Sequence, residues 1–317
     1  AYEGLLSHVR VHNYPLSDTD VTVLHSEYTP LDPVDFHPDY TETILRADKS
    51  PMKAVLNATG LGQDAYGFTF RTDGSGWYRL NTDNTIDSMT CVTPWDLYYR
   101  HIEAFDHSGS VPPFNPYSDN DPTGIEFYNN GLNCITAVDG KIMQWTCSPA
   151  YEIRNMTLNT SIGIRIIVEP VSAVIWTVRF GDNGNILYVT EGVYLYVYNL
   201  SAPYDIENMG VYSLRVSLSA FANYPYSFQL SPDGTSFYAF DRSIIGVVQY
   251  TLNTPWDVTD KVAAGQFSAA GATCRGGYIS PDGTRMYLAE QDYLHSYTLS
   301  VPWDVTSAVY DSKEMVI

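Results

Sequence analysis

Oxygen-bearing side chains gather in one segment of the sequence, and they are of the types that bind a hard cation. Asp119, Asn120 and Asp121 are consecutive, and Asp106 precedes them. Ca²⁺ takes about six to eight oxygen ligands from carboxylates, amides and carbonyls. The segment therefore predicts a structural calcium ion that fixes a loop. The alternative is that these side chains hydrogen-bond to the backbone of turns, as Asp and Asn commonly do.

The same segment carries aromatic and amide side chains that suit the binding of sugars. Phe114, Asn115 and Tyr117 stand shortly before the acidic run. Aromatic rings stack on the apolar faces of sugar rings, and amides hydrogen-bond to hydroxyl groups. Loops on a rigid scaffold are where binding usually takes place. These three residues are therefore candidates for the recognition of a surface ligand.

The cysteines predict neither a zinc site nor a dithiol redox motif, because none belongs to a Cys-x-x-Cys sequence. They are Cys91, Cys134, Cys147 and Cys274. Cys134 and Cys147 flank the turn Asp139-Gly140. Pairing about that turn places Cys134 opposite Trp145, so a Cys134–Cys147 disulfide would need a bulge or a twist. Buried thiols are the alternative.

A short sequence motif recurs five times and sets the positions of all these groups. A strand-like stretch ends in a tight turn at a glycine, and a proline follows 18 to 21 residues later, with an aromatic residue close behind it. The turn glycines are Gly74, Gly131, Gly184, Gly234 and Gly283, and the prolines are Pro94, Pro149, Pro203, Pro255 and Pro302. A period of 47 to 55 residues between the prolines indicates a repeat architecture.

Each repeat contains four short strand candidates, rich in the β-branched and aromatic residues that suit a pleated sheet. In the fourth copy they are Tyr226–Leu230, Ser236–Phe240, Ile245–Leu252 and Val262–Phe267. The proline ends the third strand because it cannot donate to the ladder. We expect the aromatic residue to pack between neighbouring units and the following acid to accept from turn amides. Four-stranded units repeated radially predict an all-β fold, a β-propeller.

Five blades are legible in residues 51–317, and residues 1–50 differ from them. The first fifty residues lack a turn of the repeat type. They do contain Val21–Leu24 and a proline-rich stretch after it, which resemble a degenerate copy of the third strand of the repeat and the corner that follows it. Two interpretations stay open for this segment: a degenerate sixth blade, or an arm that attaches a five-bladed ring.

The inner strands are where a propeller enzyme gathers its acids, bases and histidines. The predicted inner strands are Gly67–Phe70, Gly124–Phe127, Trp176–Phe180, Tyr226–Leu230 and Gly277–Ile279. Together they offer Glu126, Arg179 and Gln229, with Arg71 and Arg275 just outside. Neither a nucleophile elbow, a His-Glu-x-x-His sequence nor a phosphate-binding loop is present. We therefore predict that the chain is not an enzyme.

The charge of the chain excludes two classes of partner. With 36 acidic and 17 basic residues, the net charge is −19, and the Lys and Arg residues are scattered singly. Nucleic acids and anionic membrane surfaces require clustered positive charge. No apolar run reaches the roughly 18 residues of a membrane helix. We therefore expect neither nucleic-acid binding nor membrane insertion.

The last two repeats resemble a propeller repeat that is widespread in bacteriophage structural proteins, notably those of marine phages. The resemblance rests on Ser231-Pro-Asp-Gly-Thr-Ser-Phe-Tyr238 with Pro255-Trp-Asp257, and on Ser280-Pro-Asp-Gly-Thr-Arg-Met-Tyr287 with Pro302-Trp-Asp304. The family pattern reads SPDGTKMY…VYQYTLSTPWDVSTASYDS. The resemblance implies a protein on the virion surface, outside the cell, such as a tail-fibre head or a corticovirus-type vertex spike.

The function that this resemblance implies is attachment to a host cell-surface glycan or protein through loops on the propeller. Other virion proteins at a capsid vertex or tail would be its partners, and homo-oligomers on the particle are compatible with it. Multiple copies would multiply weak single-site contacts. The alternatives are a propeller-fold glycan-active hydrolase, depolymerase or lactonase-like enzyme, and a purely architectural particle protein.

Overall fold

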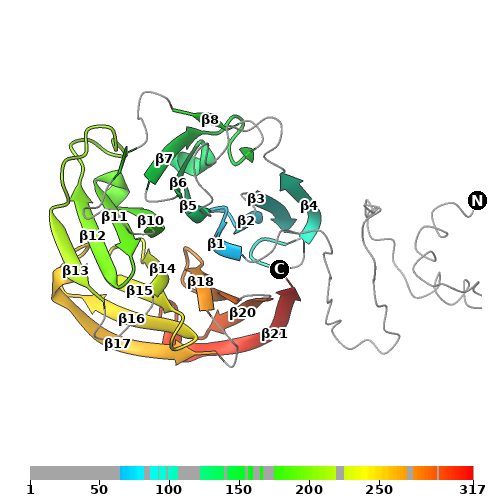
Figure 1. Ribbon diagram of the computed structural model, residues 1–317. Helices are drawn as coiled ribbons and strands as arrows, with labels where there is room; N and C mark the ends of the chain where they lie inside the picture. Colours follow the sequence, from blue (N-terminus) through cyan, green and yellow to red (C-terminus); the bar gives the residue numbers. More distant parts are fainter. Residues whose placement is uncertain are drawn as a thin grey trace, which may run out of the picture. The chain divides into compact units, whose positions relative to one another are not determined.

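The computed structural model describes residues 65–81, 86–91, 93–97, 99–105, 122–138, 141–153, 156–159, 165–166, 175–218, 225–269, 274–290 and 293–316. Within these ranges the chain forms five antiparallel sheets around a common centre, as Figure 1 shows. The predicted all-β propeller is therefore confirmed. Residues 1–50 lie outside the described ranges, so both interpretations of that segment stay predictions.

Four of the blades are regular four-stranded meanders that run from the centre outward. Blade 1 consists of β1 (Ala65–Phe70), β2 (Gly76–Asn81), β3 (Ile86–Cys91) and β4 (Tyr99–Phe105). Blade 3 consists of β10 (Ile175–Gly181), β11 (Ile186–Glu191), β12 (Tyr194–Asn199) and β13 (Leu214–Ser217). Blade 4 consists of β14 (Pro225–Leu230), β15 (Ser236–Asp241), β16 (Gly246–Leu252) and β17 (Lys261–Ser268). Blade 5 consists of β18 (Cys274–Ile279), β19 (Arg285–Glu290), β20 (Tyr293–Leu299) and β21 (Ala308–Val316).

Blade 2 departs from this pattern at its outer edge. It consists of β5 (Pro122–Tyr128), β6 (Asn133–Val138) and β7 (Lys141–Thr146), followed by the two-residue strands β8 (Thr157–Leu158) and β9 (Arg165–Ile166). Both short strands pair with β7, so together they take the place of one outer strand.

The cysteines of blade 2 are thiols. Cys134 lies opposite Trp145 in the β6–β7 ladder, as the turn predicted. Cys134 and Cys147 are both buried and free, so the candidate disulfide is not formed and the alternative of buried thiols holds. Burial raises the pKa of both groups, to about 12 for Cys147. Neither thiol is therefore a ready nucleophile, because the thiolate is the reactive form.

Helix is confined to single turns in the described part of the chain. The 3₁₀ turns are η1 (Asn129–Gly131), η4 (Asp182–Gly184), η5 (Val258–Asp260) and η6 (Val305–Ser307). None of the helical segments in the described ranges has the length and hydropathy that a membrane span requires.

The recurring glycine and the recurring aromatic residue form one corner in each blade. The corner aromatics are Trp95, Tyr151, Tyr204, Trp256 and Trp303, and all five have φ between 64° and 68°. The backbone N–H of each donates to the carbonyl of the turn glycine of its own blade, at 2.8 to 3.0 Å. The aromatic ring lies against that glycine: a Cβ built on Gly234 would stand 2.3 Å from Cδ2 of Trp256.

The acid that follows the aromatic residue fixes the next turn, as the sequence predicts. Asp257 accepts from the backbone N–H of Thr259 at 2.9 Å, and Asp304 accepts from that of Thr306 at the same distance. Each acid thereby caps a 3₁₀ turn, η5 or η6, that leads into the outermost strand of its blade. The proline–aromatic–acid phrase is therefore a structural corner.

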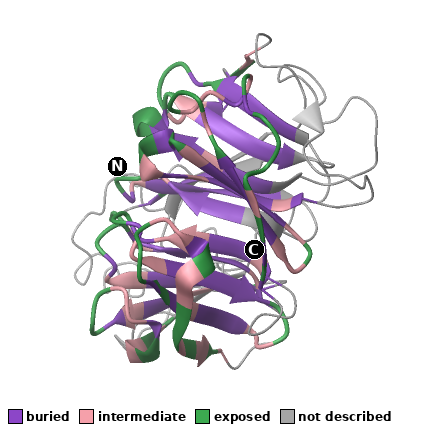
Figure 2. Cartoon of the chain, turned by 90° about the vertical axis from the view of Figure 1, so that its left-hand side faces the viewer, coloured by how far each residue is buried: buried purple, intermediate pink, exposed green. Residues whose placement is uncertain are grey.

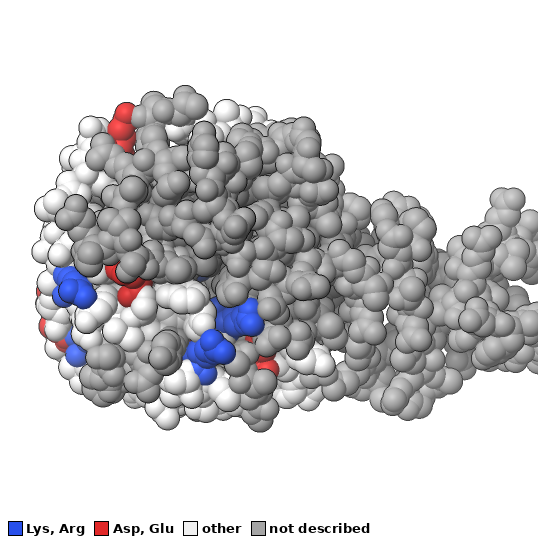
Figure 3. Space-filling view, viewed as in Figure 1, with Lys and Arg blue, Asp and Glu red and all other residues white. Residues whose placement is uncertain are grey.

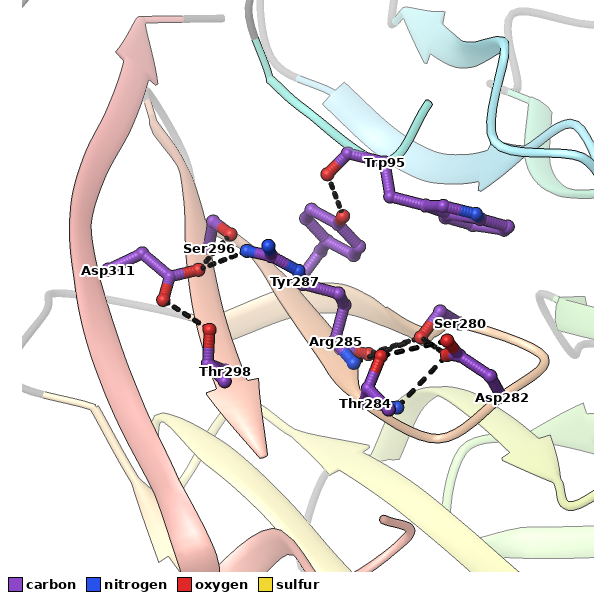
Figure 4. Close-up of polar contacts among 9 residues, drawn as sticks. All are labelled: Trp95, Ser280, Asp282, Thr284, Arg285, Tyr287, Ser296, Thr298 and Asp311. Atoms are coloured by element: carbon purple, nitrogen blue, oxygen red, sulfur yellow. Dashed lines mark hydrogen bonds and ion pairs between the residues drawn. The ribbon is translucent and has the colours of Figure 1, made fainter. Parts of the chain in front are cut away.

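Tyrosine hydroxyls join four of the five corners to the preceding blade. On second strands, Tyr78 donates to the carbonyl of Tyr151 at 2.6 Å, Tyr188 to that of Trp256 at 2.6 Å, and Tyr238 to that of Trp303 at 2.7 Å. Tyr287 donates to the carbonyl of Trp95 and so joins blade 5 to blade 1, as Figure 4 shows. Ring closure therefore uses the same joint as the other boundaries.

Blade 2 makes this joint with a different side chain. Ile135 stands where the other second strands carry the tyrosine, four residues after the turn glycine. Gln144 on β7 replaces it, and its Nε2 donates to the carbonyl of Tyr204 at 3.0 Å. Gln144 also donates to the hydroxyl of Tyr128. The joint is thus preserved at every boundary of the described ring although the residue that makes it changes.

Two further features stabilise the fold, the burial of the strands and a polar network within blade 5. The strands are largely buried, and exposure is concentrated in the connecting turns and outer edges (Figure 2). In blade 5, Asp311 of the outer strand β21 accepts from Ser296 at 2.7 Å and from Thr298 at 2.6 Å, and it pairs with Arg285 at 3.1 Å (Figure 4). This network ties β21 to β20 and β19.

Replacing the corner glycine should reveal how much the corner contributes to stability. Gly234→Ala should lower the free energy of unfolding by about 3 kcal/mol, because φ there is +70° and the new methyl overlaps the Trp256 ring. Gly192→Ala has a positive φ but open space, so it should show the conformational strain alone, about 1 kcal/mol. Gly210→Ala, which has neither feature, should be near neutral. Urea unfolding measures all three, and equal losses for Gly234 and Gly192 would show that the ring contact is unimportant.

Removing one joint hydroxyl tests the link between blades. Tyr238→Phe should cost about 1 kcal/mol, since it deletes the hydrogen bond to the carbonyl of Trp303 and keeps the ring. Tyr293→Phe, at a tyrosine that is 40 % exposed, is the matched control and should leave the denaturation midpoint unchanged. Indistinguishable midpoints for the two variants would contradict the role of the joint.

Candidate functional site

One position of the repeat lines a central pocket in every blade. Counting five residues back from each turn glycine gives Thr69, Glu126, Arg179, Gln229 and Tyr278, one on each inner strand. All five line a pocket of about 180 Å³. The inner strands lie side by side around the centre in Figure 1, which is why equivalent positions converge.

The pocket has polar and apolar walls. The residue after each of the first four polar positions is apolar and also lines it: Phe70, Phe127, Phe180 and Leu230. Turns complete the wall with Thr72, Ser231, Pro232 and Trp256. Thr72 is held by the hydroxyl of Tyr151, whose oxygen lies 2.5 Å from its Oγ1. A lining in which a few polar groups are set among apolar side chains is typical of small-molecule sites.

Glu126 is a carboxyl group held between two blades. Its Oε2 accepts from the backbone N–H of Phe180 at 2.7 Å, and its Oε1 lies 4.0 Å from Nη1 of Arg179. The side chain is 20 % exposed. Burial raises the pKa of Glu126 to about 7, although the charge of Arg179 and the Phe180 amide both act to lower it. A carboxyl group with a pKa near neutrality can both accept and donate a proton at physiological pH.

Arg179 is a buried cation with a free donor. The residue is 6 % exposed, and its Nη1 makes a long contact of 3.5 Å with the carbonyl of Ile125. Its Nε is buried and has no hydrogen-bond partner among the described residues. An unsatisfied buried donor on a charged group costs free energy. The guanidinium is therefore under-satisfied at the wall of the pocket.

Gln229 shows that the contact between neighbouring inner strands does not need a carboxylate. It occupies the same repeat position in blade 4, where its Oε1 accepts from the backbone N–H of Ile279 at 2.7 Å and its Nε2 donates to the carbonyl of that residue at 2.7 Å. An amide thus satisfies both groups of the neighbouring strand. Glu126 makes the equivalent bond to Phe180 but carries a charge whose burial is costly.

Tyr278 supplies a hydroxyl that stays protonated. The residue is buried, and desolvation raises its pKa; the charge of Arg179 acts to lower that pKa, and the charge of Glu126 acts to raise it further. These electrostatic couplings show that the phenol senses both charged groups of the pocket. At neutral pH its O–H is available as a hydrogen-bond donor.

The structure bears on part of the predicted site. Glu126, Arg179 and Gln229 lie on inner strands as predicted, and the structure brings them together in the pocket with Thr69 and Tyr278, which the sequence reasoning missed. The constant offset from the turn glycine would have identified both. Asp106, Asp119, Asn120 and Asp121 lie outside the described residues, as do Phe114, Asn115 and Tyr117. In the described part, no group of three or more His, Cys, Asp or Glu side chains could hold a metal ion. The calcium ion and the ligand-binding loop therefore stay predictions.

The described part of the face seen in Figure 3 carries dispersed charge. Side chains of both signs are set there among uncharged ones. The charged residues that line the pocket itself are Glu126 and Arg179. The electrostatics of the site are therefore dominated by one pair.

Comparison with known proteins supports the fold. No family model and no curated protein matches the chain. A solved structure from Bacteroides uniformis, described as a putative 6-phosphogluconolactonase, is 13 % identical over 83 % of this chain and 87 % of its own length, with a TM-score of 0.50. A second protein of that description, from Bacteroides fragilis, is 12 % identical over 80 % of this chain and 84 % of its own, with a TM-score of 0.49. A periplasmic gluconolactonase from Pseudomonas aeruginosa is 13 % identical over 77 % and 67 %, with a TM-score of 0.43.

One of these neighbours corrects a prediction. The expectation that the chain is not an enzyme is contradicted, because the Bacteroides uniformis structure, which has a similar fold, is described as a putative 6-phosphogluconolactonase. At these identities the likeness extends to the fold. The inner strands carry few acids and bases, but burial raises the pKa of one carboxyl group, that of Glu126, to about 7.

The pH dependence of stability should report the burial of Glu126. Its pKa is about 7 in the folded protein against an ordinary value of 4.5, so the folded state holds the proton more tightly. The resulting stabilisation is complete below pH 4.5 and is lost as pH rises toward 7, by roughly 3 kcal/mol at most. Glu126→Gln should flatten this part of the profile, whereas Glu207→Gln, in the loop before β13, should not. The same slope in wild type and Glu126→Gln would contradict the assignment.

Proposed function

We propose that the protein is a hydrolase of lactones or related esters, with its active site in the central pocket. The observation that carries the proposal is Glu126, a largely buried carboxyl group with a pKa near 7 that lies 4.0 Å from the buried Arg179 in a pocket lined by all five inner strands. Strongly perturbed carboxyl groups in pockets are candidates for acid–base catalysis. The contact between neighbouring inner strands does not require this charge, because Gln229 makes the same contact with an amide.

The proposed reaction adds one water molecule to a lactone. Glu126, when ionised, accepts a proton from water as the water oxygen bonds to the carbonyl carbon. The hydroxyl of Tyr278 donates a hydrogen bond to the carbonyl oxygen, which gains negative charge in the tetrahedral intermediate. The ring C–O bond then breaks, and the departing oxygen takes the proton from Glu126. The product is a hydroxy acid, and Glu126 returns to its starting state.

Arg179 has a positioning role in this scheme. Its positive charge, 4.0 Å from Oε1 of Glu126, favours the ionised carboxylate. It therefore limits the rise in the pKa of Glu126 that burial causes. Without Arg179, Glu126 would hold its proton to higher pH and would act as a base over a narrower range.

The pocket favours a small, sugar-derived substrate. A volume of about 180 Å³ is smaller than the sites that hold drug-sized ligands, which begin at about 300 Å³. Phe70, Phe180 and Trp256 offer apolar ring surfaces, and Thr69, Gln229 and Ser231 offer polar groups. The Bacteroides uniformis structure, described as a putative 6-phosphogluconolactonase, supports the same reaction class through its fold.

The reaction is testable with a panel of lactones. Gluconolactone, its 6-phosphate and simple aliphatic lactones should be offered to the full chain, and proton release should be followed at constant pH. We expect kcat/KM to rise as pH increases through about 7, because the base must be ionised. Glu126→Gln should lower kcat by about 10² to 10⁴-fold, the usual contribution of a positioned base.

Glu207→Gln is the matched control, since it makes the same chemical change outside the pocket. It should retain wild-type kcat and KM. Full activity of a folded Glu126→Gln protein, or a rate without any dependence on pH between 5 and 9, would exclude Glu126 as the base.

A second candidate function is attachment to a glycan on a host cell surface. The match of the last two repeats to the bacteriophage pattern favours it, and the matching residues form the turns and corners of blades 4 and 5. Such a protein can bind and hydrolyse in one molecule, displayed on a particle. Inhibition of phage adsorption by the purified protein would support this candidate, and its failure at saturating protein would count against it.

A further inference from the structure

Arg179 carries a binding capacity that the proposed hydrolysis leaves unused. Its Nη1 faces Glu126 and the carbonyl of Ile125, whereas Nε is buried without a partner. The side chain lines the pocket and is more than nine-tenths buried. A guanidinium has five donors in a fixed fork that matches two-oxygen acceptors such as carboxylate and phosphate.

We propose that the pocket contains an anion subsite centred on Arg179, and that the substrate is a lactone or ester bearing an anionic group, a carboxylate or a phosphate. The identity of this substrate rests on the proposed hydrolysis, but anion binding itself needs no turnover. The anionic group accepts from the guanidinium of Arg179, and the amide of Gln229 and the hydroxyls of Thr69 and Ser231 are further polar groups of the same wall.

The energetics favour such a ligand. Arg179 is a buried charge, and its nearest carboxyl oxygen lies 4.0 Å away, beyond hydrogen-bond distance. A bound anion would pair with this weakly satisfied guanidinium through a charge-assisted hydrogen bond in a place shielded from water. The net charge of −19 repels anions from the molecule as a whole. Any measurable affinity for a small anion therefore points to a local site.

Glu126 makes the subsite sensitive to pH. The charged and titratable groups that line the pocket are Glu126 from β5, Arg179 from β10 and Tyr278 from β18. From β1, β14 and the turns that follow them come uncharged polar groups, those of Thr69, Thr72, Gln229 and Ser231. When Glu126 is ionised, it repels an anion and competes for Arg179. Protonation removes both effects, so anion binding should tighten as pH falls through about 7.

Sulfate is a suitable probe, because its charge does not change between pH 5 and 9. Isothermal titration of the full chain with sulfate at pH 6 should give one site per chain. Arg179→Gln should weaken the affinity by at least about tenfold, since it removes a charge-assisted bond. Arg242→Gln removes the same charge from an exposed side chain on blade 4 and should have no effect. Arg179→Lys keeps the charge but loses the fork, and it should fall between wild type and Arg179→Gln.

Glu126→Gln provides a second, independent readout. It should bind sulfate at pH 8 as well as at pH 6, whereas wild type should bind several-fold more weakly at pH 8. The absence of sulfate binding to wild type at pH 6, or unchanged binding in a folded Arg179→Gln protein, would overturn the proposal. Were Arg179→Gln unable to fold, the wild-type titration and the pH dependence of Glu126→Gln would decide.

Two further arms separate the sources of the anion and the two proposals. Tighter binding of inorganic phosphate than of acetate at pH 6 would identify a phosphate-bearing substrate, and the reverse would identify a carboxylate. Sulfate binding without hydrolysis of any lactone would keep the subsite and refute the proposed reaction. Hydrolysis without sulfate binding would refute the subsite and keep the reaction.

Discussion

One repeated pair of contacts holds this propeller together. In each blade an aromatic ring lies against the turn glycine, and a side chain of the neighbouring blade, a tyrosine or Gln144, donates to the carbonyl of that aromatic residue. The contact of ring and glycine requires a positive φ at both the turn glycine and the aromatic residue. Both conformations are costly for ordinary residues, and the surrounding hydrogen bonds maintain them. The recurring spacing of glycine and proline–aromatic pairs is therefore a constraint imposed by one contact.

Ring closure follows from the same contact. Blades 1 and 5 are each built from their own consecutive strands, and the described ring is closed by Tyr287 on the carbonyl of Trp95 together with the packing of β1 against β18 (Figure 4). In blade 2 the tyrosine is missing and Gln144 restores the bond. These joints link neighbouring blades, and equivalent positions of the five inner strands meet at the centre. Those positions form the pocket.

The candidate site uses a position that the fold leaves free to vary. The residue five before the turn glycine is Thr, Glu, Arg, Gln or Tyr in the five blades, whereas its neighbours are mostly apolar. Where it is Gln229, the side chain satisfies both backbone groups of the next strand. Where it is Glu126, one backbone amide is satisfied and a titratable oxygen faces Arg179. A titratable carboxyl group thus occupies a position that makes a purely structural contact between inner strands in blade 4.

Much of the fold could be predicted from the sequence, because turn glycines, strand-ending prolines and β-rich runs are local signals. The corners of blades 4 and 5 are read directly from their Pro-Asp-Gly and Pro-Trp-Asp sequences. The split outer edge of blade 2 and the substitution by Gln144 could not be predicted, since they depend on which groups meet across blades. The pKa of Glu126 was equally hidden, because strands far apart in the sequence supply its burial and its charged neighbour.

Direct titration of Glu126 tests the central claim that burial between the blades of the ring gives this carboxyl group a pKa near 7. Carbon-13 NMR of the side-chain carboxyl, assigned by comparison with Glu126→Gln, would give its pKa in the intact chain. The account predicts a midpoint near 7 in the wild type and a higher one in Arg179→Gln, where the favourable charge is lost. A midpoint near the ordinary 4.5 in both proteins would contradict it.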